Sequence, residues 1–140
     1  MSGPVHLLGT FLHLARASEQ RQRPLVRDKL LVLSGVLAAR MELPRIAAFC
    51  RLQVLQHNTQ HLVRRWDSLE EALEDDEFLH FLRHLQRHYP QEKAERMLAS
   101  LGVEMARERE AYYSDDEYAA ALLGTTLVQL NEMFGDTPEK

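Results

Sequence analysis

The chain has 140 residues, of which 45% are hydrophobic and 27% are charged. This balance is typical of one globular domain and excludes an intrinsically disordered chain. The single cysteine, Cys50, excludes an intramolecular disulfide and a Cys-X-X-Cys metal or redox motif, and it favours a reducing, cytoplasmic location. The sequence holds no run of about 18 apolar residues that could span a bilayer, so we expect no membrane partner.

The net charge of −4 conceals a strong asymmetry along the chain. Residues 1–66 contain ten Lys or Arg against three Asp or Glu, whereas residues 67–140 contain seven against eighteen. Such polarity can mark an interaction surface. The alternative is that the two halves pack together, with their charges facing each other within one domain.

Prolines and capping residues divide the chain into predicted helices. Residues 5–17 resemble an export signal, but no basic residue precedes them and two histidines interrupt them, which favours an amphipathic helix. Capping boxes at Ser68/Glu71 and Ser114/Glu117 mark two helix starts, and Asp75 or Asp76 and Thr125 or Thr126 mark two more. The expected helical segments are residues 5–17, 24–41, 44–66, 68–89 with a restart at Asp75 or Asp76, 90–110, 114–123 and 126–134.

No segment alternates with the two-residue period of a strand. We therefore predict an all-α fold, a compact bundle of six to seven helices in a single domain over residues 1–140, with a short flexible tail at 135–140. A shift of 46 residues also superposes Pro44 on Pro90 and Ser68 on Ser114. This is typical of two stacked helical hairpins related by a repeat, although generic helical-hairpin patterning produces the same coincidences.

Apolar stripes at helical spacing predict the core. The segment after Pro44 carries two stripes, one through Leu52 and Leu55 and one through Cys50 and Val54, which predicts that it is the central helix. The segment after Pro24 is apolar over most of its circumference and should lie beside it. The predicted core residues are Leu30, Leu33, Val36, Leu37, Leu52, Leu55, Leu62, Trp66, Phe78, Leu82, Leu85, Leu98, Leu101 and Met105.

Histidines are the residues that could carry chemistry, since the chain lacks a P-loop, a dinucleotide-binding turn, a GxSxG elbow and an HExxH motif. His57 and His61 are one helical turn apart and could share a divalent metal with His84 or Glu77. However, the stripes place His84 and Glu77 on the solvent side. The alternative is a polar seam at His57 and His61 and a solvated face at His84, with no cofactor and no catalytic residue.

Basic residues gather around the first predicted interhelix turn. They could bind phosphate groups of nucleic acid. The overall acidity of the chain favours a solvated loop that pairs with the acidic half instead, so a nucleic-acid partner is disfavoured. The residues of this basic cluster are Arg16, Arg21, Arg23, Arg27 and Lys29.

The last predicted helix is short and amphipathic, and its apolar side needs cover from its own domain or from a partner. That side consists of Leu127, Leu130, Met133 and Phe134. Because no catalytic constellation is visible and the charge is polarised, the sequence favours a non-enzymatic protein–protein interaction module. Its partner would be another protein or a second copy of the chain, with either a homodimer or an exposed apolar groove expected.

Overall fold

The computed structural model describes residues 3–135, and all regular structure in that part of the chain is helical. The prediction of an all-α fold is therefore confirmed, with eight α-helices in residues 3–135 rather than six or seven. Apart from Gly135, the tail predicted to be flexible lies outside the described residues. The helices are α1 (Pro4–Gln20), α2 (Pro24–Arg40), α3 (Pro44–His57), α4 (Leu69–Ala72), α5 (Asp76–His88), α6 (Gln91–Ser100), α7 (Asp115–Leu122) and α8 (Leu127–Phe134), with 3-10 helices η1 (Leu62–Arg65) and η2 (Glu108–Ala111).

Helices α1, α2 and α3 form two successive antiparallel hairpins whose turns have the same design. Each turn contains one left-handed residue, Gln22 or Glu42, with φ of 59° and 63°. The residue before the next proline donates its N–H back to the preceding helix at 2.8 Å, which closes a Schellman-type cap. Pro24 and Pro44 then begin the next helix. As a result, α1 ends, α2 begins and α3 ends at the same end of the molecule.

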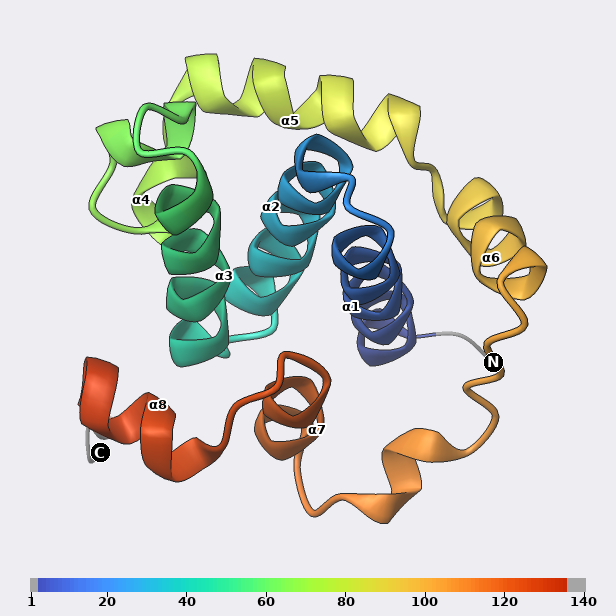
Figure 1. Cartoon of the computed structure of the whole chain (residues 1–140). Helices are drawn as coiled ribbons and strands as arrows, with labels where there is room; N and C mark the ends of the chain where they lie inside the picture. Colours follow the sequence, from blue (N-terminus) through green and yellow to red (C-terminus); the bar gives the residue numbers. More distant parts are fainter. Residues whose placement is uncertain (1–2, 136–140) are drawn as a thin grey trace.

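The remaining helices surround this three-helix layer. In Figure 1, α5, α6, α7 and α8 follow one another around α1, α2 and α3. The contacts agree, because α5 packs on α2, α6 and α7 pack on α1, and α8 packs on α3. None of the helices in residues 3–135 has the length and apolar character needed to cross a membrane.

The core is centred on α2, which lies between α1 and α3. This corrects the prediction that α3 is the central helix, because α3 flanks α2. On α3 the buried stripe is that of Ile46, Cys50 and Val54, whereas Leu52 and Leu55 are only partly buried. Of the predicted core residues, those that are buried are Leu30, Leu33, Val36, Phe78, Leu82, Leu85, Leu98 and Met105, and those that are partly exposed are Leu37, Leu52, Leu55, Leu62, Trp66 and Leu101.

Two helices are shorter than the sequence predicts. Helix α3 ends at His57 instead of Trp66, because Asn58 leaves the helical conformation and its side chain accepts the backbone N–H of Gln60. Helix α6 ends at Ser100 instead of residue 110, because Gly102 takes a φ of +75° and closes the helix end. The 3-10 helices and the caps Ser68 and Ser114 coincide under the 46-residue shift, but the repeat itself stays a prediction.

Several ion pairs join the basic first half of the chain to the acidic second half. Arg45 lies 3.7 Å from Asp116, and Arg65 lies 2.6 Å from Glu77. His13 on α1 is within 2.8 Å of a Glu108 carboxylate oxygen, and the same oxygen accepts the hydroxyl of Tyr118 at 2.6 Å. At these contacts, charges of the two halves of the chain therefore face each other within the domain, as the second interpretation of the charge asymmetry predicts.

Candidate functional site

Two adjoining cavities of about 410 and 440 Å³ open at the end of the molecule where α1 and α3 end and α2 begins. They share Glu19, Arg27 and Gln53, so we treat them as one feature, the helix-end cleft. Its wall and floor residues come from α1, α2, α3 and the α7–α8 connection. The lining residues are Leu12, Ala15, Arg16, Glu19, Gln20, Gln22, Arg23, Pro24, Arg27, Leu31, Gln53, Gln56, His57, Leu122, Leu123 and Gly124.

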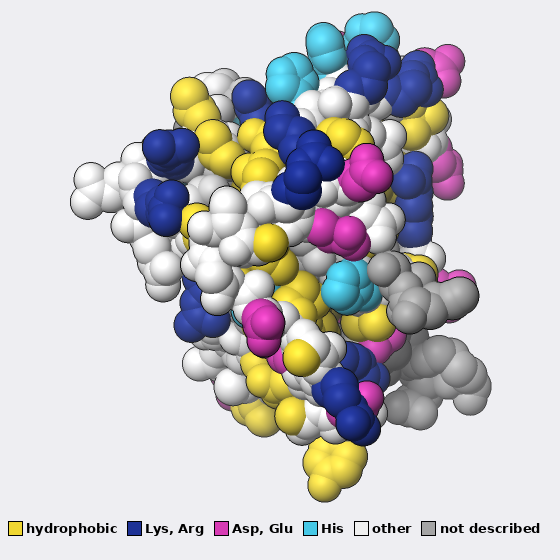
Figure 2. Space-filling view, turned by 90° about the vertical axis from the view of Figure 1, so that its right-hand side faces the viewer, with side chains coloured by type: hydrophobic (Ala, Val, Ile, Leu, Met, Phe, Trp, Pro, Cys, Tyr) yellow, Lys and Arg dark blue, Asp and Glu magenta, His cyan; other side chains and the backbone are white. Residues whose placement is uncertain are grey.

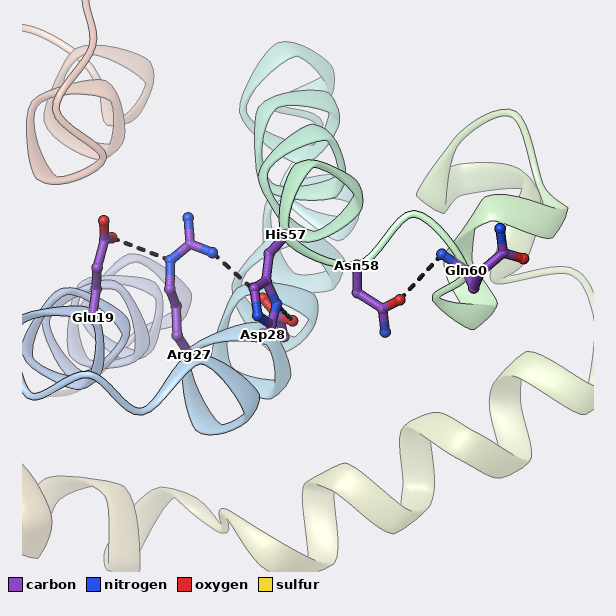
Figure 3. Close-up of polar contacts among 6 residues, drawn as sticks. All are labelled: Glu19, Arg27, Asp28, His57, Asn58 and Gln60. Carbon is purple, nitrogen blue, oxygen red and sulfur yellow. Dashed lines mark hydrogen bonds and ion pairs between the residues drawn. The ribbon is translucent and has the colours of Figure 1, made fainter.

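Glu19, Arg27 and His57 line the cleft, and the buried Asp28 behind them links Arg27 to His57 (Figure 3). The Arg27 guanidinium donates from Nε to Glu19 at 3.1 Å and from Nη1 to Asp28 Oδ1 at 3.4 Å. The other carboxylate oxygen of Asp28 lies 2.5 Å from Nδ1 of His57. Because Asp28 is only 3% exposed, its carboxylate depends on these two donors in place of water. We call these four residues, Glu19, Arg27, Asp28 and His57, the charged row.

The local structure explains how the row is assembled. Asp28 lies in the second turn of α2, and His57 is the last residue of α3. The antiparallel hairpin brings these two positions to the same level. The Asn58–Gln60 contact turns the chain away immediately after His57 (Figure 3), so the imidazole lies against Asp28 instead of continuing a helical face.

The cleft combines four kinds of recognition chemistry. The amides of Gln53 and Gln56 can both donate and accept hydrogen bonds, as a peptide backbone requires. With Nδ1 of His57 directed at Asp28, the second ring nitrogen is left for a ligand. Arg16 and Arg23 are exposed, and neither forms an ion pair within residues 3–135. The leucines of the first cavity add an apolar floor.

The residues predicted to share a metal are not brought together. His61 caps η1 by accepting the N–H of Val63, and burial lowers its pKa, against a smaller opposing effect of Asp28. Glu77 is ion-paired with Arg65, and His84 lies on the exposed face of α5. In the part of the chain that the structure describes, no group of three or more His, Cys, Asp or Glu side chains is placed to hold a metal ion.

The predicted basic cluster is divided between several places. Arg16, Arg23 and Arg27 line the helix-end cleft, although Arg27 is already ion-paired with Glu19 and Asp28. Arg21 lines a cavity of about 150 Å³ that Arg23 also lines. Lys29 is exposed on α2 and is not among the lining residues of the cleft. The structure therefore brings three of the five cations to the cleft, with Arg21 beside it.

The predicted interface on α8 is partly used inside the domain. Leu130 is completely buried and Leu127 packs against the core. Met133 and Phe134 remain 46% and 37% exposed, and Val128, which the sequence pattern did not single out, is 66% exposed. The outward side of α8 thus carries three apolar side chains.

Cys50 is completely buried, and the loss of hydration raises the pKa of its thiol to about 12, against a smaller lowering by Arg27. A thiol with that pKa is protonated at neutral pH and is a poor nucleophile. The cysteine therefore belongs to the α2–α3 packing and not to the cleft.

Comparison with protein-family models, with curated proteins and with solved structures gives no match to this chain.

Proposed function

We propose that this protein is a non-enzymatic protein–protein interaction module that binds an acidic, extended segment of another protein in the helix-end cleft. The observation that carries the proposal is the pair of exposed arginines, Arg16 and Arg23, at a cleft whose third arginine, Arg27, is already ion-paired with Glu19 and Asp28. An incoming carboxylate would find cations that make no ion pair in the described part of the chain.

The other features of the cleft favour a peptide over a compact ligand. Two adjoining cavities require an elongated occupant. The amides of Gln53 and Gln56 match the alternating donors and acceptors of an extended backbone. The apolar floor of the first cavity, with Leu12 and Leu31, suits one aliphatic or aromatic side chain. The charged row holds Arg27 and His57 in place, which lowers the entropy lost on binding.

An array of short synthetic peptides tests this proposal. Each peptide carries one leucine or phenylalanine and an increasing number of Asp or Glu residues, and matched peptides carry Lys or Arg instead. We expect the labelled protein to retain acidic peptides and not basic ones. The variant Arg16→Gln/Arg23→Gln should weaken retention by roughly twofold to thirtyfold, because each of the two exposed ion pairs contributes about 0.2–1 kcal/mol.

The matched control is Arg83→Gln/Arg87→Gln, which removes the same charge from exposed positions on α5. Retention of acidic peptides should be unchanged in this control. Equal binding of acidic and basic peptides, or equal losses in the two variants, would contradict the proposal.

A further inference from the structure

The outward face of α5 carries an unusual concentration of nitrogen-bearing side chains. The helix buries Phe78, Leu82 and Leu85 on one side. On the opposite side, over two turns, every residue is either histidine or arginine and all are exposed. These residues are His80, Arg83, His84, Arg87 and His88.

The rings on this face form a row. The ring centroids of His80 and His84 are 6.2 Å apart, and those of His84 and His88 are 6.1 Å apart. Tyr89, half-buried against the core, adjoins the last of these rings at 6.3 Å, and the ammonium of Lys93 on α6 lies 5.4 Å from the Tyr89 ring centroid. We call His80, His84, His88 and Tyr89 the ring row. Histidine side chains also gather beside Lys or Arg side chains at the upper edge of Figure 2, the edge that α5 occupies in Figure 1.

The cations beside the ring row are available to a ligand. Across residues 3–135, no carboxylate lies within ion-pair distance of Arg83, Arg87 or Lys93. Arg87 instead lies 3.5 Å from Nδ1 of His84. Glu77, at the start of the helix, forms an ion pair with Arg65.

We propose that this face of α5 binds single-stranded nucleic acid, with Arg83, Arg87 and Lys93 contacting phosphates and the ring row contacting bases. The imidazoles of His80, His84 and His88 are exposed and stand among cations, and Tyr89 at their end is partly exposed. Proteins hold single strands with such rings and cations, since every base has a face that can stack and every phosphate is negative. A double helix keeps its bases stacked and out of reach of such rings, so an unpaired strand is the ligand that fits. This site is separate from the predicted basic cluster, and it does not rest on the function proposed for the cleft.

Fluorescence anisotropy with labelled oligothymidylate and oligouridylate tests the proposal on the full chain. We expect binding at low salt that weakens as salt rises, with a log–log slope of roughly −2 for three phosphate contacts. The variant Arg83→Gln/Arg87→Gln should flatten this slope by about 1.4. The variant His84→Ala/His88→Ala should weaken binding on the order of tenfold while leaving the slope unchanged, because it removes stacking and not permanent charge.

The cleft variant Arg16→Gln/Arg23→Gln is the matched control, because it removes two exposed arginines far from the ring row in sequence. It should bind the oligonucleotides as the parent does. The proposal is overturned by an absence of binding at low salt, by equal binding of a duplex, by parental affinity in the histidine variant, or by equal losses in the two arginine variants. Circular dichroism of each variant separates loss of binding from loss of folding.

Discussion

Replacing His57 by alanine should destabilise the protein through the carboxylate that it leaves behind. The Asp28 side chain keeps only the 3.4 Å contact with Arg27 once the 2.5 Å contact with His57 is lost. Breaking a fully buried ion pair costs about 3–5 kcal/mol. The side chain of His57 is 34% exposed, so water can replace part of the contact, and we expect a loss of about 1–2 kcal/mol. For a chain of 140 residues this lowers the melting temperature by about 3–7 °C.

A double-mutant cycle isolates this interaction. Urea unfolding followed by circular dichroism is measured for the parent, His57→Ala, Asp28→Asn and the double variant. We expect a coupling energy of about 1 kcal/mol, because alanine at 57 should cost little once the charge at 28 is gone. His84→Ala, at an exposed position on α5, is the control for losing an imidazole and should leave the free energy of unfolding within about 0.5 kcal/mol. A coupling energy near zero would refute the dependence of Asp28 on His57.

Two further predictions concern the packing of α2 against α3. Burial raises the pKa of the Cys50 thiol from 9.0 to about 12, so the thiol should resist alkylation at pH 8 until the protein unfolds. Above pH 9 the thiol ionises in the unfolded chain and not in the folded one. The free energy of unfolding of the parent should therefore fall by about 1.4 kcal/mol per pH unit more than that of Cys50→Ala. Gly35→Ala would add a Cβ that collides with Leu69 Cδ1 and lies 3.1 Å from Cys50 Cβ. We expect the cost of this overpacking to exceed the gain in helix propensity of about 1 kcal/mol, so the variant should be less stable than the parent in urea. A variant as stable as the parent would contradict the close approach of α2 and α3 at Gly35.

The positions of the helix starts could be predicted from sequence because they depend on local physics. Ser68, Asp75, Ser114 and Thr126 each accept a backbone N–H in the first turn of the helix that follows. Such a bond needs only the residue and its next three neighbours. The ends of α3 and α6 were not predicted because the helical pattern of apolar residues continues past Asn58 and Gly102, the two residues at which the backbone leaves the helix.

The orientation of α3 could not be predicted from its own sequence. Its two stripes are both apolar, so the hydrophobic pattern alone does not say which one faces α2. Tertiary contacts between α2 and α3 determine which stripe is buried. Gly35 lets the helices approach closely at Cys50, and this contact places the Ile46, Cys50 and Val54 stripe inward. Leu52 and Leu55 are then left at the edge of the core.

The contact between Asp28 and His57 was missed for a related reason. Read as one continuous helix, the sequence pairs His57 with His61, one turn on. The α2–α3 hairpin gives a better rule, because antiparallel helices place residues at equal distances from their turn opposite each other. Gly35 and Cys50 are equidistant from the turn at residues 41–44 and are in contact, and Asp28 and His57 are equidistant as well. A carboxylate within an apolar helix needs a partner, and the turn defined by Pro44 identifies His57 as the residue opposite it.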